Sequence, residues 1–399
     1  MNILIIDEEF PYPLNTGKRI RSFNLAHALS RENRVSYLAY GEQGSNGCAH
    51  LESAGITPIA VGELGRKKSG PRFYLRLLAN LFSPYPYIVA HHYTRRFARE
   101  VSRRSSTGDF DIVICEWSPY ARFVRNLTEI PSVVVAHNIE ASIWRRYLEN
   151  ETNPLKRAYI ALQFRKVERF ERSCFLWAAG ATAVSRHEAD TIARFGVPYP
   201  VAVIDNGVDT EYFRPGGISP DPDTLVFTGS MDWRPNQDAV AYFADDVFPR
   251  IRAERPGANV YVVGRNPPIQ IRELGLRDGI TVTGTVDDVR PYIERAGVYI
   301  VPLRIGGGSR LKILEAMAMS KVVVSTSVGA EGLEVVDGEH LLIRDGSEAL
   351  ARQILECMAN LPAYESLGGR GRRLVEQRYR WEELGRRYNE YLQTILKRA

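Results

Sequence analysis

The sequence has few cysteines and no long apolar run, and each absence excludes a class of protein. No stretch of about eighteen consecutive apolar residues occurs, so we expect no membrane-spanning helix. The four cysteines lie far apart without Cys-x-x-Cys spacing, which argues against a zinc knuckle and a disulfide scaffold and fits buried thiols in a reducing cytoplasm. They are Cys48, Cys115, Cys174 and Cys357. We therefore expect a cytoplasmic protein that is not integral to a membrane.

The opening residues also lack the basic start and the long apolar core of a signal peptide. The short apolar run Met1 to Ile6 is followed by Asp7, Glu8 and Glu9, and it predicts a first β-strand. The apolar fraction of 44% and the charged fraction of 25% are those of an ordinary globular protein. A chain of 399 residues exceeds what one hydrophobic core usually supports, so two domains are expected.

Short β-branched runs alternate with helical stretches in both halves of the chain. The runs are residues 3–7, 35–39, 111–116, 132–136 and 180–184, then 224–229, 259–264, 280–284, 298–302 and 321–326. This alternation predicts parallel sheets covered by helices, and a continuous apolar run such as Val133-Val134-Val135 suits a strand buried on both faces. We therefore predict an α/β fold of two doubly wound, Rossmann-like domains, with ligands in a cleft between them.

The expected boundary between these domains lies near residue 198. Gly196, Pro198 and Pro200 interrupt the chain there, between a helical stretch and the short strand 201–204. We predict a first domain over 1–198, a second over 199–379, and a terminal helix over about 380–399 that crosses back to the first. The Asp221-Pro222-Asp223 acid pair precedes a strand and reads as a surface turn.

Residues 66–104 concentrate positive charge although the net charge is only +5: ten Lys or Arg stand there with one acid, Glu100. The apolar residues among them are Phe73, Tyr74, Leu77, Leu78, Leu81 and Phe82. This mixture is typical of a surface that meets anionic lipid headgroups. The alternative is a solvated helix face whose apolar residues turn towards the core.

The densest motif runs from Val301 to Ala318 and predicts a strand, a glycine loop and a helix. Glycines at 306, 307 and 308 let the backbone approach an anion, and the new helix offers free N–H groups. Arg310 and Lys312 add the charge that a diphosphate requires, and Glu315 lies where a carboxylate can accept ribose hydroxyls. A bare glycine loop could be only a tight turn, so the two cations carry this prediction.

At this motif the sequence resembles the family 4 glycosyltransferases of the GT-B fold. Their donor-binding helix commonly reads Glu-x7-Glu followed by Ala-Met-Ala; the second glutamate matches Glu315, while Gly307 occupies the position of the first. Further matches are the stretches 204–209, 227–230 and 282–284. The resemblance implies a retaining enzyme that uses a nucleotide-sugar donor. It also implies that backbone N–H groups, Arg310 and Lys312 take over donor binding from the first glutamate, which this chain lacks.

The resemblance also implies roles for individual residues. It assigns Arg310 and Lys312 to leaving-group stabilisation and His137, which follows the strand 132–136, to the donor sugar. Its donor-binding set is Gly17, Gly229, Ser230, Arg234, Gly307, Gly308, Ser309, Leu311 and Glu315. Weaker candidates for contacts with the acceptor are Asn138, Glu140 and Asn206. The family usually carries an Arg and a Lys after the Gly229 strand; here either Arg234 takes their place or Arg310 and Lys312 suffice.

From these residues we expect transfer of a sugar from a UDP- or GDP-sugar to a glycan or lipid-linked acceptor, in surface polysaccharide or glycoconjugate synthesis. No Asp-x-Asp pair follows a strand in a metal-binding context, so no metal and no other cofactor are expected. An anionic membrane is a possible peripheral partner through residues 66–104, and nucleic acid is not an expected partner. The oligomeric state is open.

Two other functions stay open: a nucleotide-sugar epimerase on the same fold, and a non-catalytic subunit that binds a nucleotide sugar. An NAD-dependent dehydrogenase is disfavoured because residues 7–17 lack Gly-x-Gly-x-x-Gly after the first strand. A P-loop NTPase is excluded because Arg19 follows Gly17-Lys18 where Ser or Thr is required.

Overall fold

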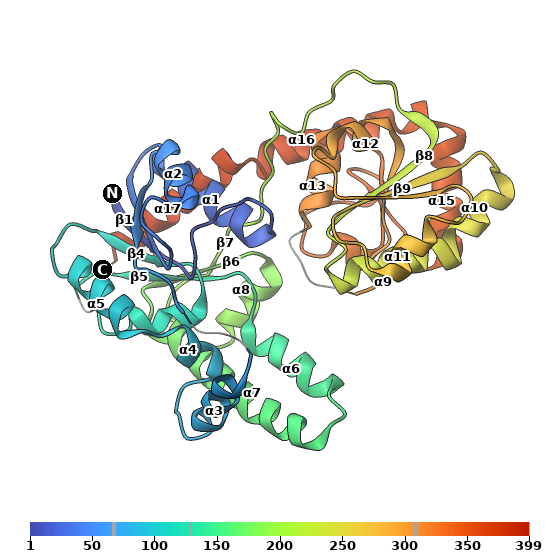
Figure 1. Cartoon of the computed structure of the whole chain (residues 1–399). Helices are drawn as coiled ribbons and strands as arrows, with labels where there is room; N and C mark the ends of the chain where they lie inside the picture. Colours follow the sequence, from blue (N-terminus) through green and yellow to red (C-terminus); the bar gives the residue numbers. More distant parts are fainter. Residues whose placement is uncertain (66–68, 128, 306–309, 399) are drawn as a thin grey trace. The chain divides into compact units, whose positions relative to one another are not determined.

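The chain forms two compact units, each built on its own parallel sheet. The computed structural model describes residues 1–65, 69–127, 129–305 and 310–398. One unit comprises Met1–Asp205 with Leu384–Ala399, and the other comprises Asn206–Glu383. Helices surround the central sheet of each unit (Figure 1). This arrangement confirms the predicted fold class of two Rossmann-like, doubly wound domains.

The first unit carries a seven-stranded sheet of order β3-β2-β1-β4-β5-β6-β7, in which every pairing is parallel. The strands are β1 (Asn2–Ile6), β2 (Arg34–Ala39), β3 (Thr57–Ala60), β4 (Ile112–Cys115), β5 (Ser132–Ala136), β6 (Gly180–Ala183) and β7 (Ala202–Val203). All residues of β4 and β5 are buried. Strands covered on both faces need apolar side chains on both, which explains their unbroken apolar runs.

Helices connect these strands. They are α1 (Gly17–Ser30), α2 (Asn46–Ser53), α3 (Pro71–Asn80), α4 (Tyr87–His92), α5 (Arg95–Ser105), the 3-10 helix η1 (Ser118–Phe123), α6 (Glu140–Asn150), α7 (Pro154–Trp177) and α8 (Arg186–Ala193). Side chains cap several of them: Thr16 accepts the Arg19 N–H at the start of α1, and Thr94 accepts the Phe97 N–H at the start of α5.

The second unit carries a six-stranded parallel sheet of order β10-β9-β8-β11-β12-β13. The strands are β8 (Asp221–Thr228), β9 (Asn259–Val263), β10 (Ile280–Gly284), β11 (Ala296–Val301), β12 (Val323–Ser325) and β13 (Leu342–Ile343). The helices are α9 (Arg234–Tyr242), a π-helical turn η2 (Phe243–Val247), α10 (Phe248–Glu254), α11 (Ile269–Leu274), α12 (Arg290–Arg295), α13 (Leu311–Ala318), α14 (Ser327–Ala330), α15 (Ser347–Ala359) and α16 (Leu361–Arg378).

The boundary between the units lies at Asp205/Asn206, later than the expected residue 198. The reason is β7, which pairs with β6 through Thr182–Ala202 and Ala183–Val203 and therefore belongs to the first sheet. The last helix, α17 (Trp381–Leu396), carries the chain from the second unit back to the first. In the first unit its Tyr391 hydroxyl accepts the Ala181 N–H of β6.

Two smaller expectations were wrong. Asp221, Pro222 and Asp223 are the first residues of β8 rather than a surface turn, at the amino end of the strand. Strands β3 and β13 were not predicted, because each is short and carries few of the residues that mark strands. Among the described residues no helix is long and apolar enough to cross a membrane.

Candidate functional site

In both sheets the strand order reverses between two neighbouring strands, β1 and β4 in the first unit and β8 and β11 in the second. Ligands of open α/β sheets bind beyond the carboxyl ends of the strands at such a point, because the connecting loops diverge there and leave a crevice. In the second unit β8 ends at Thr228, β11 ends at Val301, and α13 begins at Leu311. The predicted donor residues of the second unit that the structure describes, which are Gly229, Ser230, Arg234, Leu311 and Glu315, therefore lie on the segments that follow β8 and β11 at this switch point.

Lys312, in the first turn of α13, is the central cation at this point. Its Nζ donates to Asn236 Oδ1 at 2.7 Å and lies 4.0 Å from the centre of the Phe227 ring. Burial lowers the pKa of Lys312 to about 7; the Glu315 carboxylate opposes this shift, and the neighbouring Arg310 adds to it. The ammonium group therefore lacks a full counter-charge, and a bound anion would supply one.

Glu315 lies one turn further along α13 and is half-buried. Burial raises the pKa of its carboxyl to about 7, against the lowering effect of Lys312. Burial therefore shifts the pKa values of the carboxyl and of the Lys312 amine towards each other. A carboxyl at this depth can accept or donate a hydrogen bond to a sugar hydroxyl, as the sequence predicted for ribose.

Arg310 precedes α13 in a left-handed backbone conformation, with φ of 53°. This region is unfavourable for a side chain other than glycine by about 1–2 kcal/mol, so the surrounding structure must hold it there. The guanidinium is buried and contacts Glu331, with Nη2 3.2 Å from Oε2 and Nε 3.3 Å from the backbone oxygen. Burial lowers its pKa, and Glu331 opposes that shift.

Glycine at two positions, 229 and 264, leaves room for the close contacts around Lys312. A Cβ on Gly229 would lie 2.6 Å from Lys312 Nζ and 2.8 Å from Asn236 Nδ2. A Cβ on Gly264, which follows β9, would overlap the Gly229 carbonyl oxygen. The site therefore needs glycine at both positions, and the structure gives a steric reason for the predicted Gly229.

Ser230 connects the site to a residue that sequence reasoning missed. Arg265, directly after β9, donates from Nε to Ser230 Oγ at 3.0 Å and lies 3.4 Å from Asp232 Oδ2. Its position directly after the predicted strand 259–264, beside the switch point, was the available signal. Arg234 is exposed at the start of α9, and Leu311 is the first residue of α13. Gly307, Gly308 and Ser309 lie outside the described residues.

At the first unit's switch point, His137 pairs with a buried carboxylate. His137 Nε2 lies 3.0 Å from Glu116 Oε2, which also accepts the Ser22 hydroxyl at 2.9 Å. Burial acts to raise the pKa of Glu116, but His137 and the buried Arg21 outweigh it and lower the pKa overall. Because Glu116 follows β4 and His137 follows β5, two adjacent strands deliver the pair to one edge of the sheet.

The acids after β1 form a second cluster that the sequence did not single out as functional. Lys18 Nζ bridges Asp7 Oδ1 at 2.7 Å and Glu8 Oε1 at 2.8 Å, and the Tyr37 hydroxyl donates to Asp7 Oδ2. Gly17 opens α1 directly before Lys18. The loop after β1 is therefore anchored by charge at the same edge of the sheet as His137 and Glu116.

The three weaker candidates are placed differently. Asn138 is exposed next to His137. Glu140 is buried at the start of α6, accepts the Trp117 Nε1–H at 2.8 Å, and has a pKa raised by burial. Asn206 is partly exposed and begins the second unit. Glu140 therefore has a clear packing role, whereas contacts of these residues with an acceptor stay predictions.

Comparisons with known proteins identify the family. Residues 22–212 match the family described as Glycosyltransferase Family 4, and residues 222–360 match Glycosyl transferases group 1. The chain belongs to the family 4 glycosyltransferases. The resemblance read from the glycine loop is thereby confirmed, and the glycosyltransferase has the two-sheet GT-B fold that the family implies.

Individual relatives of this glycosyltransferase are distant. An uncharacterized 44.6 kDa protein in the cps region of Klebsiella pneumoniae is 21% identical over 94% of this chain and 96% of its own length. A GDP-mannose-dependent alpha-(1-6)-phosphatidylinositol monomannoside mannosyltransferase of Mycobacterium tuberculosis is 26% identical over 50% of this chain and 57% of its own. Anabaena HepE, solved with UDP and glucose, has a TM-score of 0.67 at 14% identity, covering 98% of this chain and 99% of its own.

Proposed function

We propose that this glycosyltransferase moves a sugar from a nucleoside-diphosphate sugar to a glycan or lipid-linked acceptor, with retention of the anomeric configuration. The observation that carries the proposal is Lys312, held without a full counter-charge beside Gly229 at the switch point of the second sheet. The named relatives support a nucleotide-sugar donor: one depends on GDP-mannose, and the other was solved with UDP. The donor is accordingly a UDP- or GDP-sugar.

In this proposal the donor diphosphate binds at the start of α13. Negative charge grows on the diphosphate oxygens as the sugar leaves, so Lys312, Arg310 and the free N–H groups of the first helical turn stabilise the transition state more than the ground state. Glu315 takes the ribose hydroxyls. Because side-chain cations supply this neutralisation, the chemistry requires no metal ion.

His137 acts on the reacting sugar, and the first unit binds the acceptor. Glu116 accepts the Nε2–H of His137 and so fixes the ring orientation, which leaves Nδ1 as the atom that can accept a hydrogen bond from a sugar hydroxyl. The incoming hydroxyl attacks from the face that the diphosphate leaves, which retains the configuration. The diphosphate oxygen is the base that takes the acceptor proton.

Turnover tests this proposal. Purified protein is incubated with each UDP- or GDP-sugar and with lipid-linked or glycan acceptors, and the nucleoside diphosphate and the product are quantified. Acceptor-dependent release of nucleoside diphosphate, with a product linkage of the donor's configuration by NMR, is expected. Release of a rearranged sugar without acceptor would instead identify an epimerase, and tight nucleotide binding without any turnover would identify a non-catalytic subunit.

The lowered pKa of Lys312 predicts a pH-dependent affinity for nucleoside diphosphate. Lys312 loses its proton above its pKa of about 7, and Glu315, whose pKa is also about 7, gains negative charge over the same range. Both changes weaken anion binding as pH rises, so titration calorimetry should show roughly tenfold weaker binding at pH 8.5 than at pH 7. The Lys312→Arg variant, which stays charged, should lose most of this dependence. An affinity independent of pH in the native protein contradicts the assignment.

We also propose peripheral contact with the cytoplasmic face of an anionic membrane through residues 66–104. The structure favours this over the alternative in which the apolar residues face the core, because α3 and the turn after it expose four of the six predicted apolar residues and also Leu75, while Phe73 and Leu77 are half-buried. We call this set the α3 apolar surface: Tyr74, Leu75, Leu78, Leu81 and Phe82. Phe82 is 92% exposed. Exposed apolar side chains beside basic ones are typical of membrane-surface helices.

Sedimentation with vesicles tests this contact. Replacing Leu75 and Leu78 by aspartate should abolish pelleting with phosphatidylglycerol-containing vesicles at low salt, because two charges would enter the lipid interface. Leu155→Asp, at an exposed leucine on α7, is the matched control and should pellet like the native protein. No lipid-dependent pelleting of the native protein, or equal loss in the control, would refute the contact.

A further inference from the structure

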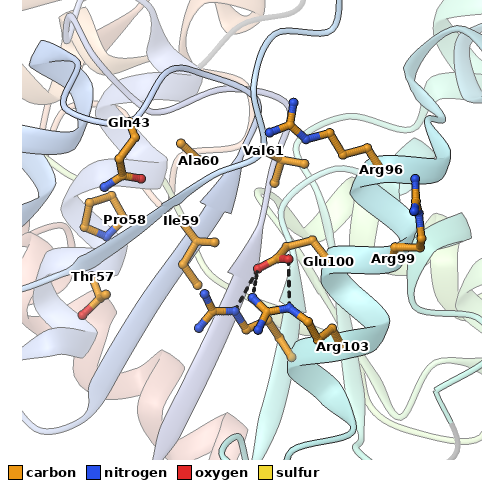
Figure 2. A pocket seen from close by; sticks show the side chains of 11 residues that line it. Gln43, Thr57, Pro58, Ile59, Ala60, Val61, Arg96, Arg99, Glu100 and Arg103 are labelled. Carbon is orange, nitrogen blue, oxygen red and sulfur yellow. Dashed lines mark hydrogen bonds and ion pairs between the residues drawn. The ribbon is translucent and has the colours of Figure 1, made fainter.

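A basic pocket lies between helix α5 and the edge strand β3 of the first unit (Figure 2). Its volume is about 640 Å³, within the range of small-molecule sites. Four arginines and one acid line it: Arg96, Arg99, Arg103, Arg104 and Glu100. The opposite wall is formed by residues 57–61, with Gln43 at the rim. The pocket therefore holds an excess of three positive charges.

The single acid is already engaged. Glu100 lies 2.6 Å from Arg103 and 3.0 Å from Arg104, and these bonds lower the pKa of its carboxyl. Arg96 and Arg99 have no carboxylate partner within the described residues. Figure 2 shows both along the same helix, with the dashed interactions confined to Glu100 and its two partners. Arg99 donates from Nε to the Arg95 backbone oxygen at 3.4 Å, so its terminal N–H groups and the Arg96 guanidinium are available to a ligand.

This arrangement is unfavourable in the absence of an anion. Residues three and four apart on a helix are neighbours, and like charges at these spacings destabilise the helix. Arg96, Arg99 and Arg103 follow one another at these spacings on α5. A local arrangement that opposes folding without an evident gain is expected at a functional site.

Arg96 is positioned by the strand opposite. Gly62, after β3, has φ of 73°, and a Cβ there would lie 2.5 Å from Arg96 Nη1. Glycine at this position therefore permits both the left-handed backbone conformation and the close approach of the Arg96 guanidinium. Arg96 is exposed, and its guanidinium lies beside the Gly62 backbone, where a ligand can reach it.

The pocket is separate from the donor site and from the α3 apolar surface, although its arginines belong to the basic stretch 66–104. Strand β3 is at the edge of the sheet, two strands away from β1, where the order reverses. Pro58 lies in the middle of β3 and has no N–H to offer an added strand, so the edge is poorly suited to a bound peptide. Arginine clusters instead match phosphate groups, whose oxygens accept paired hydrogen bonds from a guanidinium.

We propose that the pocket between α5 and β3 binds a multiply charged phosphate compound, a diphosphate or a phosphate ester, through Arg96 and Arg99. This site is additional to the donor site at Lys312 and does not depend on the transferase chemistry. The same phosphate chemistry occurs in free sugar phosphates and in lipid headgroups.

Calorimetric titration with inorganic pyrophosphate tests the site. The full chain with Lys312→Ala is used, because that substitution weakens the donor site, which would otherwise bind the probe. In this background pyrophosphate should still bind, and adding Arg96→Gln with Arg99→Gln should weaken it at least about tenfold. The matched control adds Arg146→Gln with Arg157→Gln, two exposed arginines on α6 and α7, and should stay within about twofold. Equal unfolding temperatures confirm that all variants fold.

Absence of binding in the Lys312→Ala background, or an equal loss in both pairs of variants, overturns the proposal. Sedimentation with phosphatidic-acid vesicles then distinguishes the two sources. If Arg96→Gln with Arg99→Gln also lowers pelleting, the ligand is a lipid headgroup. If pelleting is unchanged while pyrophosphate binding is lost, the ligand is a free phosphate compound.

Discussion

Replacing Lys312 by alanine should weaken nucleoside-diphosphate affinity by at least about tenfold and lower kcat/KM by about 10²–10³-fold. The larger effect on turnover follows because the diphosphate gains charge as the sugar departs, so the missing cation matters most in the transition state. Titration calorimetry and initial rates measure the two effects separately.

The matched control for this variant is Arg272→Ala, which removes one positive charge from the exposed face of α11 in the same unit. It should leave affinity and rate within about twofold, because exposed charges are screened by solvent. If Lys312→Ala binds nucleotide as tightly as the native protein does, Lys312 is not the diphosphate ligand. Arg310→Ala should also weaken binding by about tenfold.

Replacing Glu116 by alanine should lower the free energy of unfolding of the first unit by about 3–5 kcal/mol. Glu116 is 2% exposed, and Arg21, which is 1% exposed, depends on it for charge compensation. Nη1 of Arg21 donates to the Asp205 backbone oxygen, but Nε and Nη2 have no hydrogen-bond partner within the described residues. Removing the carboxylate would therefore leave a buried cation without its neighbouring anion.

Urea unfolding of the full chain measures this loss, from the transition that belongs to the first unit. Glu52→Ala, at an exposed glutamate on α2, is the control and should change stability by no more than about 0.5 kcal/mol. Glu116→Gln should cost less than the alanine variant, since the amide oxygen can still accept the Ser22 hydroxyl. An alanine variant as stable as the control would show that Arg21 is compensated in another way.

The strands that could be predicted from the sequence are those with continuous apolar runs. Residues 132–136 are all buried in β5, so their pattern reflects burial directly. Strand β3 could not be predicted, because it has four residues, contains Pro58 and pairs on one side only. The sequence predicted a strand over 201–204 but not that it pairs with β6 in the first sheet, which is why the expected boundary fell too early.

The candidate site was predictable where its residues are close in sequence. Arg310, Lys312 and Glu315 share one motif, so their helix could be read directly. The hydrogen-bond partners of the site residues could not be predicted, because they are distant in sequence. Asn236, which accepts from Lys312, is 76 residues from it, and Glu116 is 21 residues from His137. Such pairs depend on which strands are neighbours. The α3 apolar surface was ambiguous because the sequence shows no clear period there, and only the packing revealed its exposure.

Thermal unfolding against UDP, GDP, CDP and dTDP and their common sugar conjugates tests the central claim most directly, since a ligand that binds only the folded state raises the melting temperature. We predict that one nucleoside diphosphate and one of its sugars raise the melting temperature of the native protein, and that NAD and ATP do not. The same ligands should have little effect on Lys312→Ala. If no nucleotide stabilises the native protein, or if Lys312→Ala is stabilised equally, the donor site is not at the start of α13.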